Sequence, residues 1–172
     1  MASFGKLHKK GSMDGDLELS LNINNLDVKC KTSGSTTLLN LLRELGYVEV
    51  KCGCEEGACG SCLVLLNGRA VNSCQVFAAT VDNARILTVN GLGNSGNPHP
   101  IELAFVEAQA VQCGFCTPGM IIATYELLSK NPSPSEEDIK VALSGNLCRC
   151  TGYIKIIDAV KLAVKKLKNK YD

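Results

Sequence analysis

The chain has 172 residues, 45% of them hydrophobic, and nearly balanced charges, with 18 Lys and Arg against 17 Asp and Glu. This length suffices for one domain or two small ones, and the near-neutral charge gives no reason to expect nucleic acid as a partner. No stretch approaches the ~20 consecutive apolar residues of a membrane span, and residues 1–16 lack the apolar core of a signal peptide. Ten cysteines without an export signal favour metal-binding thiolates in the cytoplasm over disulfides.

The first half of the chain predicts a small sheet with one helix. Residues 1–16 contain glycines and mixed charges and are interpreted as a flexible, solvated tail. Apolar and polar residues alternate from Leu17 to Ile23, which is typical of a half-buried strand, and Asn24-Asn25 and Asn67-Gly68 are typical hairpin turns. The other elements expected here are strands over 26–31, 63–66, 69–72 and 86–89 and a helix over 38–45, capped within 35–37 and ended by Gly46.

The second half predicts helices. Residues 91–98 are rich in Gly, Asn and Pro and are interpreted as a linker between domains. Helical periodicity then begins, with expected helices over 101–108 and 118–129 and a third that starts at a capping box of Ser135 and Asp138 and ends at Gly145. A last helix has its apolar face at Ile154, Ile157, Val160, Val164 and Leu167. Four short helices together predict a small bundle.

Four cysteines in the first half have a spacing that indicates a metal centre. Three follow the pattern C-x4-C-x2-C, and a fourth comes after eleven more residues: Cys54, Cys59, Cys62 and Cys74. This is the plant-type ligand spacing of a [2Fe–2S] cluster. Gly53, Gly57 and Gly60 permit the positive φ and the close backbone approach that such a loop needs. Cys30, alone in an expected strand, is interpreted as a packing residue.

A second set of four cysteines lies between the expected helices. A C-x2-C pair and a C-x-C pair are separated by 31 residues: Cys113, Cys116, Cys148 and Cys150. Each pair precedes a helix, where free N–H groups and the positive end of the dipole suit an anionic cluster. On spacing alone, a zinc ion held by four thiolates remains an alternative. His8 and His99 have no companions suited to metal binding and are interpreted as bystanders.

The runs VKCGCEEGACGSC, QCGFCTPGM and SGNLCRCTGY resemble those of the small iron–sulfur subunit of the molybdenum hydroxylases. That family includes xanthine dehydrogenases, nicotinate dehydrogenase, aldehyde oxidoreductases and aerobic carbon monoxide dehydrogenase. The resemblance covers residues 17 to about 168. It implies an α+β chain, with a β-grasp, plant-type ferredoxin domain over 17–93 followed by a helical [2Fe–2S]-binding domain, a four-helix bundle, over 98–172.

The resemblance also implies a role for each cysteine. Cys54, Cys59, Cys62 and Cys74 match the ligands of the family's distal [2Fe–2S] centre, and Cys113, Cys116, Cys148 and Cys150 match those of the proximal one. Gln112 and Cys150 match residues that contact the molybdopterin, although a cap on the nearby helix end is the structural alternative for Gln112. Cys52 occupies a position that is not a ligand in the family.

The function implied is electron transfer within an oxidoreductase, with no active site on this chain itself. Electrons would pass from molybdopterin on a large catalytic subunit through the two clusters to FAD on a medium subunit, in a cytoplasmic dimer of heterotrimers. Two alternatives remain from the residues alone. A freestanding ferredoxin explains the first motif but leaves the helical half without a purpose, and a structural zinc protein would be colourless.

Overall fold

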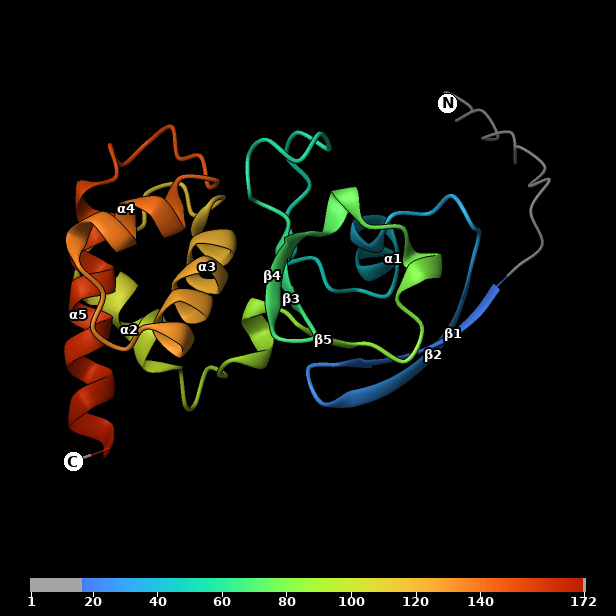
Figure 1. The fold of residues 1–172 in the computed structure, drawn as a ribbon, viewed down its shortest axis with the longest axis horizontal. Coiled ribbons are helices and arrows are strands. Elements are labelled where there is room, and N and C mark those ends of the chain that lie inside the picture. The colour runs from blue at the N-terminus through green and yellow to red at the C-terminus, as the bar shows by residue number, and fades with distance from the viewer. Residues whose placement is uncertain (1–16, 172) are drawn as a thin grey trace, which may run out of the picture.

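The computed structural model describes residues 17–171, so the expected tail over 1–16, with His8, lies outside the described residues. This part of the chain contains five strands, β1 Leu17–Ile23, β2 Leu26–Thr32, β3 Leu63–Leu66, β4 Arg69–Asn72 and β5 Arg85–Leu87 (Figure 1). Its α-helices are α1 Leu38–Glu44, α2 Pro100–Glu107, α3 Thr117–Lys130, α4 Glu136–Leu143 and α5 Ile154–Tyr171. Among the described residues, no helix combines the length and the apolar character that a membrane crossing requires.

The strands form one mixed sheet in the order β2-β1-β5-β3-β4. The central pair β1 and β5 is parallel, and the other neighbours are antiparallel. Asn24 and Asn25 adopt φ values of 53° and 66°, and Asn67 and Gly68 adopt 50° and 81°. Positive φ at both central residues is what a type I′ hairpin turn requires. Both predicted hairpins are therefore confirmed.

Helix α1 packs on this sheet. Thr37 caps its first turn, because the Thr37 hydroxyl accepts a hydrogen bond from the Asn40 N–H at 3.2 Å. Gly46 follows the helix at φ +95°, as expected for a residue that ends it. The buried leucines of α1 share one hydrophobic cluster with residues of β1, β3 and β5, among them Leu21, Val64 and Ile86. The predicted combination of a small mixed sheet and one helix is confirmed.

The last strand ends earlier than its apolar run indicated. Strand β5 stops at Leu87, two residues before the predicted boundary. The Thr88 N–H donates to the Asn24 side chain at 2.8 Å, and the Thr88 hydroxyl donates to the Glu49 carboxylate at 2.6 Å. The Asn24 side chain thus takes the place of a neighbouring strand as the partner of the Thr88 N–H. Val89 already belongs to a short 3₁₀ helix.

His99, interpreted as a bystander, has a structural role. Its Nδ1 accepts a hydrogen bond from the Ile101 N–H at 3.2 Å, while its own backbone N–H donates to the Glu102 carboxylate at 2.6 Å. The two bonds form a capping box at the start of α2. The ring also lies edge-on to Tyr125, with 5.6 Å between ring centroids. The capping box predicted at Ser135 and Asp138 is likewise present, at the start of α4.

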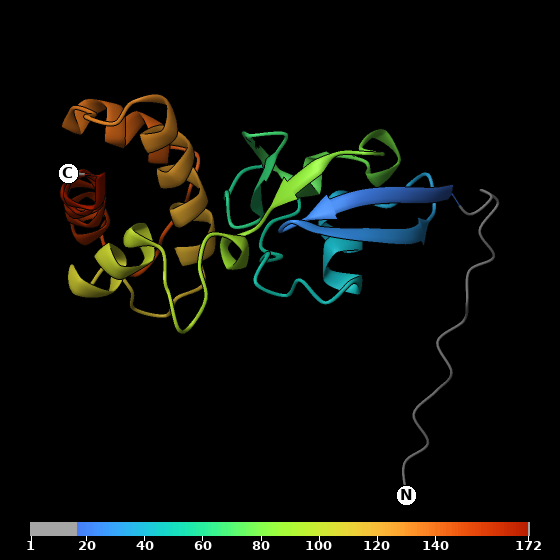
Figure 2. The same ribbon diagram turned by 90° about the horizontal axis from the view of Figure 1, so that it is seen from below.

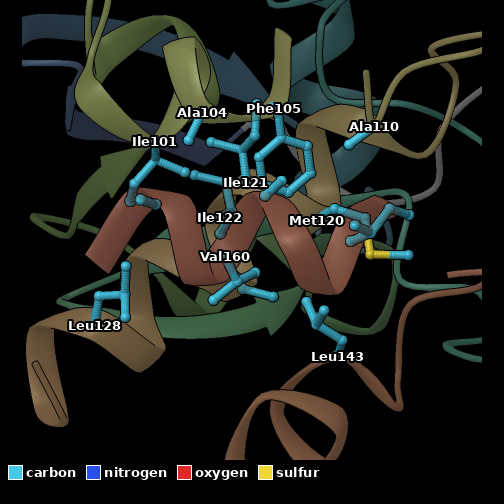
Figure 3. Close-up of a cluster of buried hydrophobic side chains, with 14 of the residues drawn as sticks. Ile101, Ala104, Phe105, Ala110, Met120, Ile121, Ile122, Leu128, Leu143 and Val160 are labelled. Atoms are coloured by element: carbon cyan, nitrogen blue, oxygen red, sulfur yellow. The ribbon is translucent and has the colours of Figure 1, made fainter. Parts of the chain in front are cut away.

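The four C-terminal helices enclose a common apolar core. Ile101 and Phe105 of α2, Ile122 of α3 and Val160 of α5 belong to it (Figure 3). The predicted apolar face of α5 is shifted in the structure. Ile154 is 69% exposed, and the fully buried positions of α5 are Ile156, Ala159, Val160 and Ala163. Helix α5 lies against α2, and its fully buried positions include two small Ala side chains.

The helical half packs directly on the sheet half. Leu65 of β3 and Val89 are buried in the same cluster as the helices, and α3 lies beside β3 and β4 (Figures 1 and 2). The Ala70 N–H of β4 donates to the Glu126 carboxylate of α3 at 3.1 Å. The fold is therefore α+β, as predicted, with a ferredoxin-like half followed by a helical half.

Candidate metal centres

The first cysteine motif forms a loop between α1 and β3. Side chains from the region of β4 close this loop, because Asn72 donates from Nδ2 to the Gly57 carbonyl at 2.9 Å. Gln75 donates from Nε2 to the Glu55 carbonyl at 3.0 Å. These bonds bring Cys74, which lies between the two donors in the sequence, to the loop that carries the other three cysteines.

The four thiols of this loop lie in two pairs. The Cys54 thiol lies close enough to that of Cys59 to affect its pKa, and the Cys62 thiol is close to that of Cys74 in the same way. Cys62 and Cys74 are buried, whereas Cys54 and Cys59 are half-buried. The Ser73 hydroxyl donates to the Cys62 carbonyl at 2.7 Å and holds the second pair together through the backbone.

Hydrogen-bond donors point at these sulfurs. The Glu56 N–H donates to Cys54 Sγ at 3.4 Å and lowers the pKa of that thiol to about 7. Gln75 Nε2 donates to Cys74 Sγ at 3.4 Å, while burial raises the pKa of the Cys62 thiol. Metal ligation requires the thiolate, and donors to sulfur stabilise its negative charge. The loop is therefore suited to an anionic metal centre.

The second motif places two cysteines before α3 and two before α5. The sulfurs of Cys113 and Cys150 lie 3.6 Å apart, and both residues are exposed. Cys116, the N-cap residue of α3, lies near Cys148, and burial raises the pKa of the Cys116 thiol to about 12. The prediction that each pair lies at a helix N-terminus is thus confirmed for the first pair, because Cys116 is the N-cap residue of α3. The second pair lies close to α5, which begins four residues after Cys150.

Tyr153 holds the second loop, which sequence reasoning missed. Its hydroxyl accepts a hydrogen bond from the Cys148 N–H at 2.9 Å, and its own N–H donates to the Thr151 hydroxyl at 3.2 Å. The Thr151 hydroxyl donates to Cys148 Sγ at 3.1 Å. Tyr153 adopts φ +69°, a conformation that non-glycine residues rarely take. A sequence pattern does not predict such a conformation for Tyr, so this role was not indicated by the sequence.

The eight cysteines thus occur as four pairs in two loops. A structural zinc site takes four ligands around one ion, whereas a [2Fe–2S] cluster distributes its four thiolates over two irons. The all-thiolate donor set, the arrangement in pairs and the donors aimed at sulfur therefore fit [2Fe–2S] clusters.

Comparison with known proteins agrees with this chemistry. Residues 21–87 match the family described as "2Fe-2S iron-sulfur cluster binding domain", and residues 88–161 match the "[2Fe-2S] binding domain". The nicotinate dehydrogenase small FeS subunit of Eubacterium barkeri is 48% identical over 154 residues, which cover 89% of this chain and 98% of that one. The chain belongs to the small iron–sulfur subunits of the molybdenum hydroxylases. It is an electron-transfer subunit of an oxidoreductase.

Other members of the family show how widely this unit is used. The xanthine dehydrogenase iron–sulfur-binding subunit of Escherichia coli O157:H7 is 40% identical, and the match covers 84% of this chain and 92% of that one. Quinoline 2-oxidoreductase from Pseudomonas putida 86 contains a chain that is 36% identical with a TM-score of 0.85, covering 90% of this chain and 97% of that one. In the aldehyde oxidoreductase of Desulfovibrio desulfuricans the match, 37% identical with a TM-score of 0.86, covers 89% of this chain but 17% of that one. There the same fold is part of a longer chain.

Three other residues considered in the sequence of this iron–sulfur subunit, Cys30, Cys52 and Gln112, lie outside the four thiol pairs. Cys30 packs against the core of the sheet half, and the Cys52 thiol donates to the Glu55 carboxylate at 3.2 Å. Gln112 is exposed, and its side chain makes no hydrogen bond to any residue within 17–171. Because Cys116 is the N-cap residue of α3, Gln112 does not cap that helix.

The two cysteine loops touch each other. The Leu147 N–H donates to the Cys59 carbonyl at 2.9 Å, and Asn146 donates from Nδ2 to the Gly60 carbonyl at 3.0 Å. A backbone hydrogen bond therefore joins Cys59 of the first loop to the residue that directly precedes Cys148 of the second. Sequence reasoning missed this contact. In the sequence, only the polar residue Asn146, two residues before Cys148, could have indicated this contact.

Proposed function

We propose that the eight paired cysteines hold two [2Fe–2S] clusters. Cys54, Cys59, Cys62 and Cys74 would bind the distal cluster, and Cys113, Cys116, Cys148 and Cys150 would bind the proximal one. The observation that carries the proposal is the presence of four thiol pairs in two loops that are hydrogen-bonded to each other. When bound, each cluster would accept and release one electron at a time.

The protein contributes the surroundings of the two centres. The N–H of Glu56 and the amide of Gln75 lie against sulfurs of the first loop, and the hydroxyl of Thr151 lies against a sulfur of the second. Such donors stabilise negative charge on sulfur and so favour the reduced state of an anionic centre. Burial of Cys62 and Cys74 excludes water from one side of the first loop.

The same subunit would connect two partners. We propose that it receives electrons from molybdopterin on a large catalytic subunit and delivers them to FAD on a medium subunit, within a cytoplasmic dimer of heterotrimers. Exposure of Cys113 and Cys150 supports contact of the second loop with a partner. Cys150 and Gln112 would contact the molybdopterin itself. The Gln112 amide, which makes no hydrogen bond to a residue within 17–171, supports this role, since an amide both donates and accepts hydrogen bonds.

We further propose that the chain is divided as the family resemblance implies. Residues 17–93 would form a β-grasp ferredoxin domain, with residues 1–16 as a flexible tail, and residues 98–172 would form a four-helix bundle. The common core of α2 to α5 supports the second assignment.

Metal analysis of the purified protein tests the proposal. Two [2Fe–2S] clusters require about four irons and about four acid-labile sulfides per chain, and the protein should be brown. Two distinct EPR signals are expected after reduction, because one centre is surrounded by a loop on a sheet and the other by helix ends. A colourless protein with stoichiometric zinc and no sulfide would refute the proposal. A protein that purifies alone with both clusters and binds no molybdenum subunit would favour a freestanding carrier.

Replacement of Gln112 by alanine tests the contact with molybdopterin. In a complex fully loaded with molybdenum, Gln112→Ala should keep both EPR signals but slow the reduction of the clusters by substrate about tenfold, the loss that corresponds to one hydrogen bond. Reduction by dithionite serves as the internal control and should be unchanged, because dithionite does not use the pterin. Substrate-driven reduction at the wild-type rate would exclude the role of Gln112.

A further inference from the structure

The contact between the two cysteine loops depends on one buried side chain. Asn146 follows α4 and is 3% exposed, and its Nδ2 donates to the Gly60 carbonyl at 3.0 Å. Its backbone N–H donates to the Leu143 carbonyl at 2.9 Å, which fixes the residue to the end of α4. A buried amide without a partner is costly, so this bond strongly favours a single position of Asn146.

The backbone is tightly packed around the Asn146 side chain. A Cβ atom on Gly60 would run into the Gly145 carbonyl and the Asn146 side chain, and a Cβ atom on Gly119 would run into the Gly60 carbonyl. Gly119 belongs to the first turn of α3, three residues after Cys116. Three backbone segments, from the first loop, from α3 and from the second loop, therefore meet around one amide.

A second Asn, Asn72 at the end of β4, makes a similar bond to the first loop but from a different part of the fold. Asn72 donates from Nδ2 to the Gly57 carbonyl at 2.9 Å, within the sheet half itself. Asn146 makes the corresponding bond to Gly60 from the helical half, across a sequence separation of 86 residues. Asn72 thus shapes the first loop, whereas Asn146 determines where that loop lies relative to the second.

We propose that Asn146 is a positioning residue that fixes the two cluster-binding loops relative to each other. Its bond to Gly60 keeps the Leu147 N–H in contact with the Cys59 carbonyl and so keeps the separation of the two centres constant. The inference rests on the proposed function, because it assigns both loops to clusters. Its consequence is that Asn146 controls communication between the centres without contacting any sulfur.

The test compares Asn146→Asp, which conserves volume but removes the donor, with Asn146→Ser and Asn72→Ala. Hydrogen exchange of the Leu147 amide in the holoprotein should accelerate about tenfold in the Asn146 variants, which corresponds to about 1.4 kcal/mol. EPR of the fully reduced protein should show a changed spin–spin interaction, because the dipolar interaction falls with the third power of distance. Asn72→Ala should alter the signal of the distal cluster but leave both the interaction and the Leu147 exchange at their wild-type values.

Iron analysis separates this test from that of the proposed function. Absence of two clusters in the wild-type protein would refute the proposed function and is measured independently of any variant. Asn146 variants that keep both clusters, with wild-type exchange and wild-type spin–spin interaction, would refute the positioning role. Asn146 variants that lose iron, but whose remaining clusters keep the wild-type spin–spin interaction, would refute it as well, because Asn146 would then be one buried loop residue among others.

Discussion

Replacement of Cys54 by serine is expected to remove the distal cluster and to leave the proximal one in place. The Glu56 N–H lies against Cys54 Sγ, and this bond lowers the pKa of the thiol to about 7, which favours the thiolate that iron requires. A serine hydroxyl stays protonated near neutral pH and is a poorer ligand for iron. Iron content should fall to about half, and one of the two EPR signals should disappear.

Two cysteines provide matched controls for this experiment. Cys52→Ser and Cys30→Ser should leave both EPR signals intact, because the Cys52 thiol donates to Glu55 and Cys30 packs against the sheet core. Loss of a cluster in Cys52→Ser, with Cys54→Ser tolerated, would show that the ligand positions are assigned two residues too late. Such an outcome would leave the proximal assignment untouched.

Replacement of Gly60 by alanine is expected to destabilise the protein strongly. Gly60 adopts φ +69°, which costs an L-residue roughly 1–2 kcal/mol, and an added methyl group would run into the Gly145 carbonyl. Overpacking of a rigid site costs about 1–3 kcal/mol more. Thermal unfolding of the holoprotein, followed by the visible absorbance of the clusters, should occur about 4–20 °C lower than in the wild type.

Two further glycines separate the causes of this effect. Gly68 has φ +81° with no atom within 4 Å of an added Cβ, so Gly68→Ala reports the cost of the backbone conformation alone. Gly119 has no positive φ, but its Cβ would meet the Gly60 carbonyl, so Gly119→Ala reports the steric conflict alone. Equal unfolding temperatures for Gly60→Ala and Gly68→Ala would show that the two loops are not tightly packed at this point.

Local sequence signals predicted most individual elements correctly. Both two-residue hairpins, the Thr37 cap of α1 and the capping box of α4 follow from interactions among residues close in the chain. Turns and helix caps of this kind form between residues of the same short segment, so they do not depend on the rest of the fold. The predictions were wrong where contacts with residues distant in the sequence determine the structure. The end of β5 depends on the side chains of Asn24 and Glu49, and the buried face of α5 depends on the shape of α2.

The amino-acid sequence by itself determined the chemistry of this iron–sulfur subunit. Thiolate is supplied by cysteine alone, and a C-x4-C-x2-C spacing places three cysteines in one short loop, which indicates the type of centre. The family was indicated by the resemblance of three sequence runs, again without coordinates. Only the tertiary structure decided how the thiols pair and how the two loops meet. Those features depend on Ser73, Tyr153 and Asn146, whose partners are set by the packing of the helical half on the sheet half. Spacing along the chain fixes no distance between residues 86 positions apart, whereas a close-packed junction fixes it through steric contact and buried hydrogen bonds.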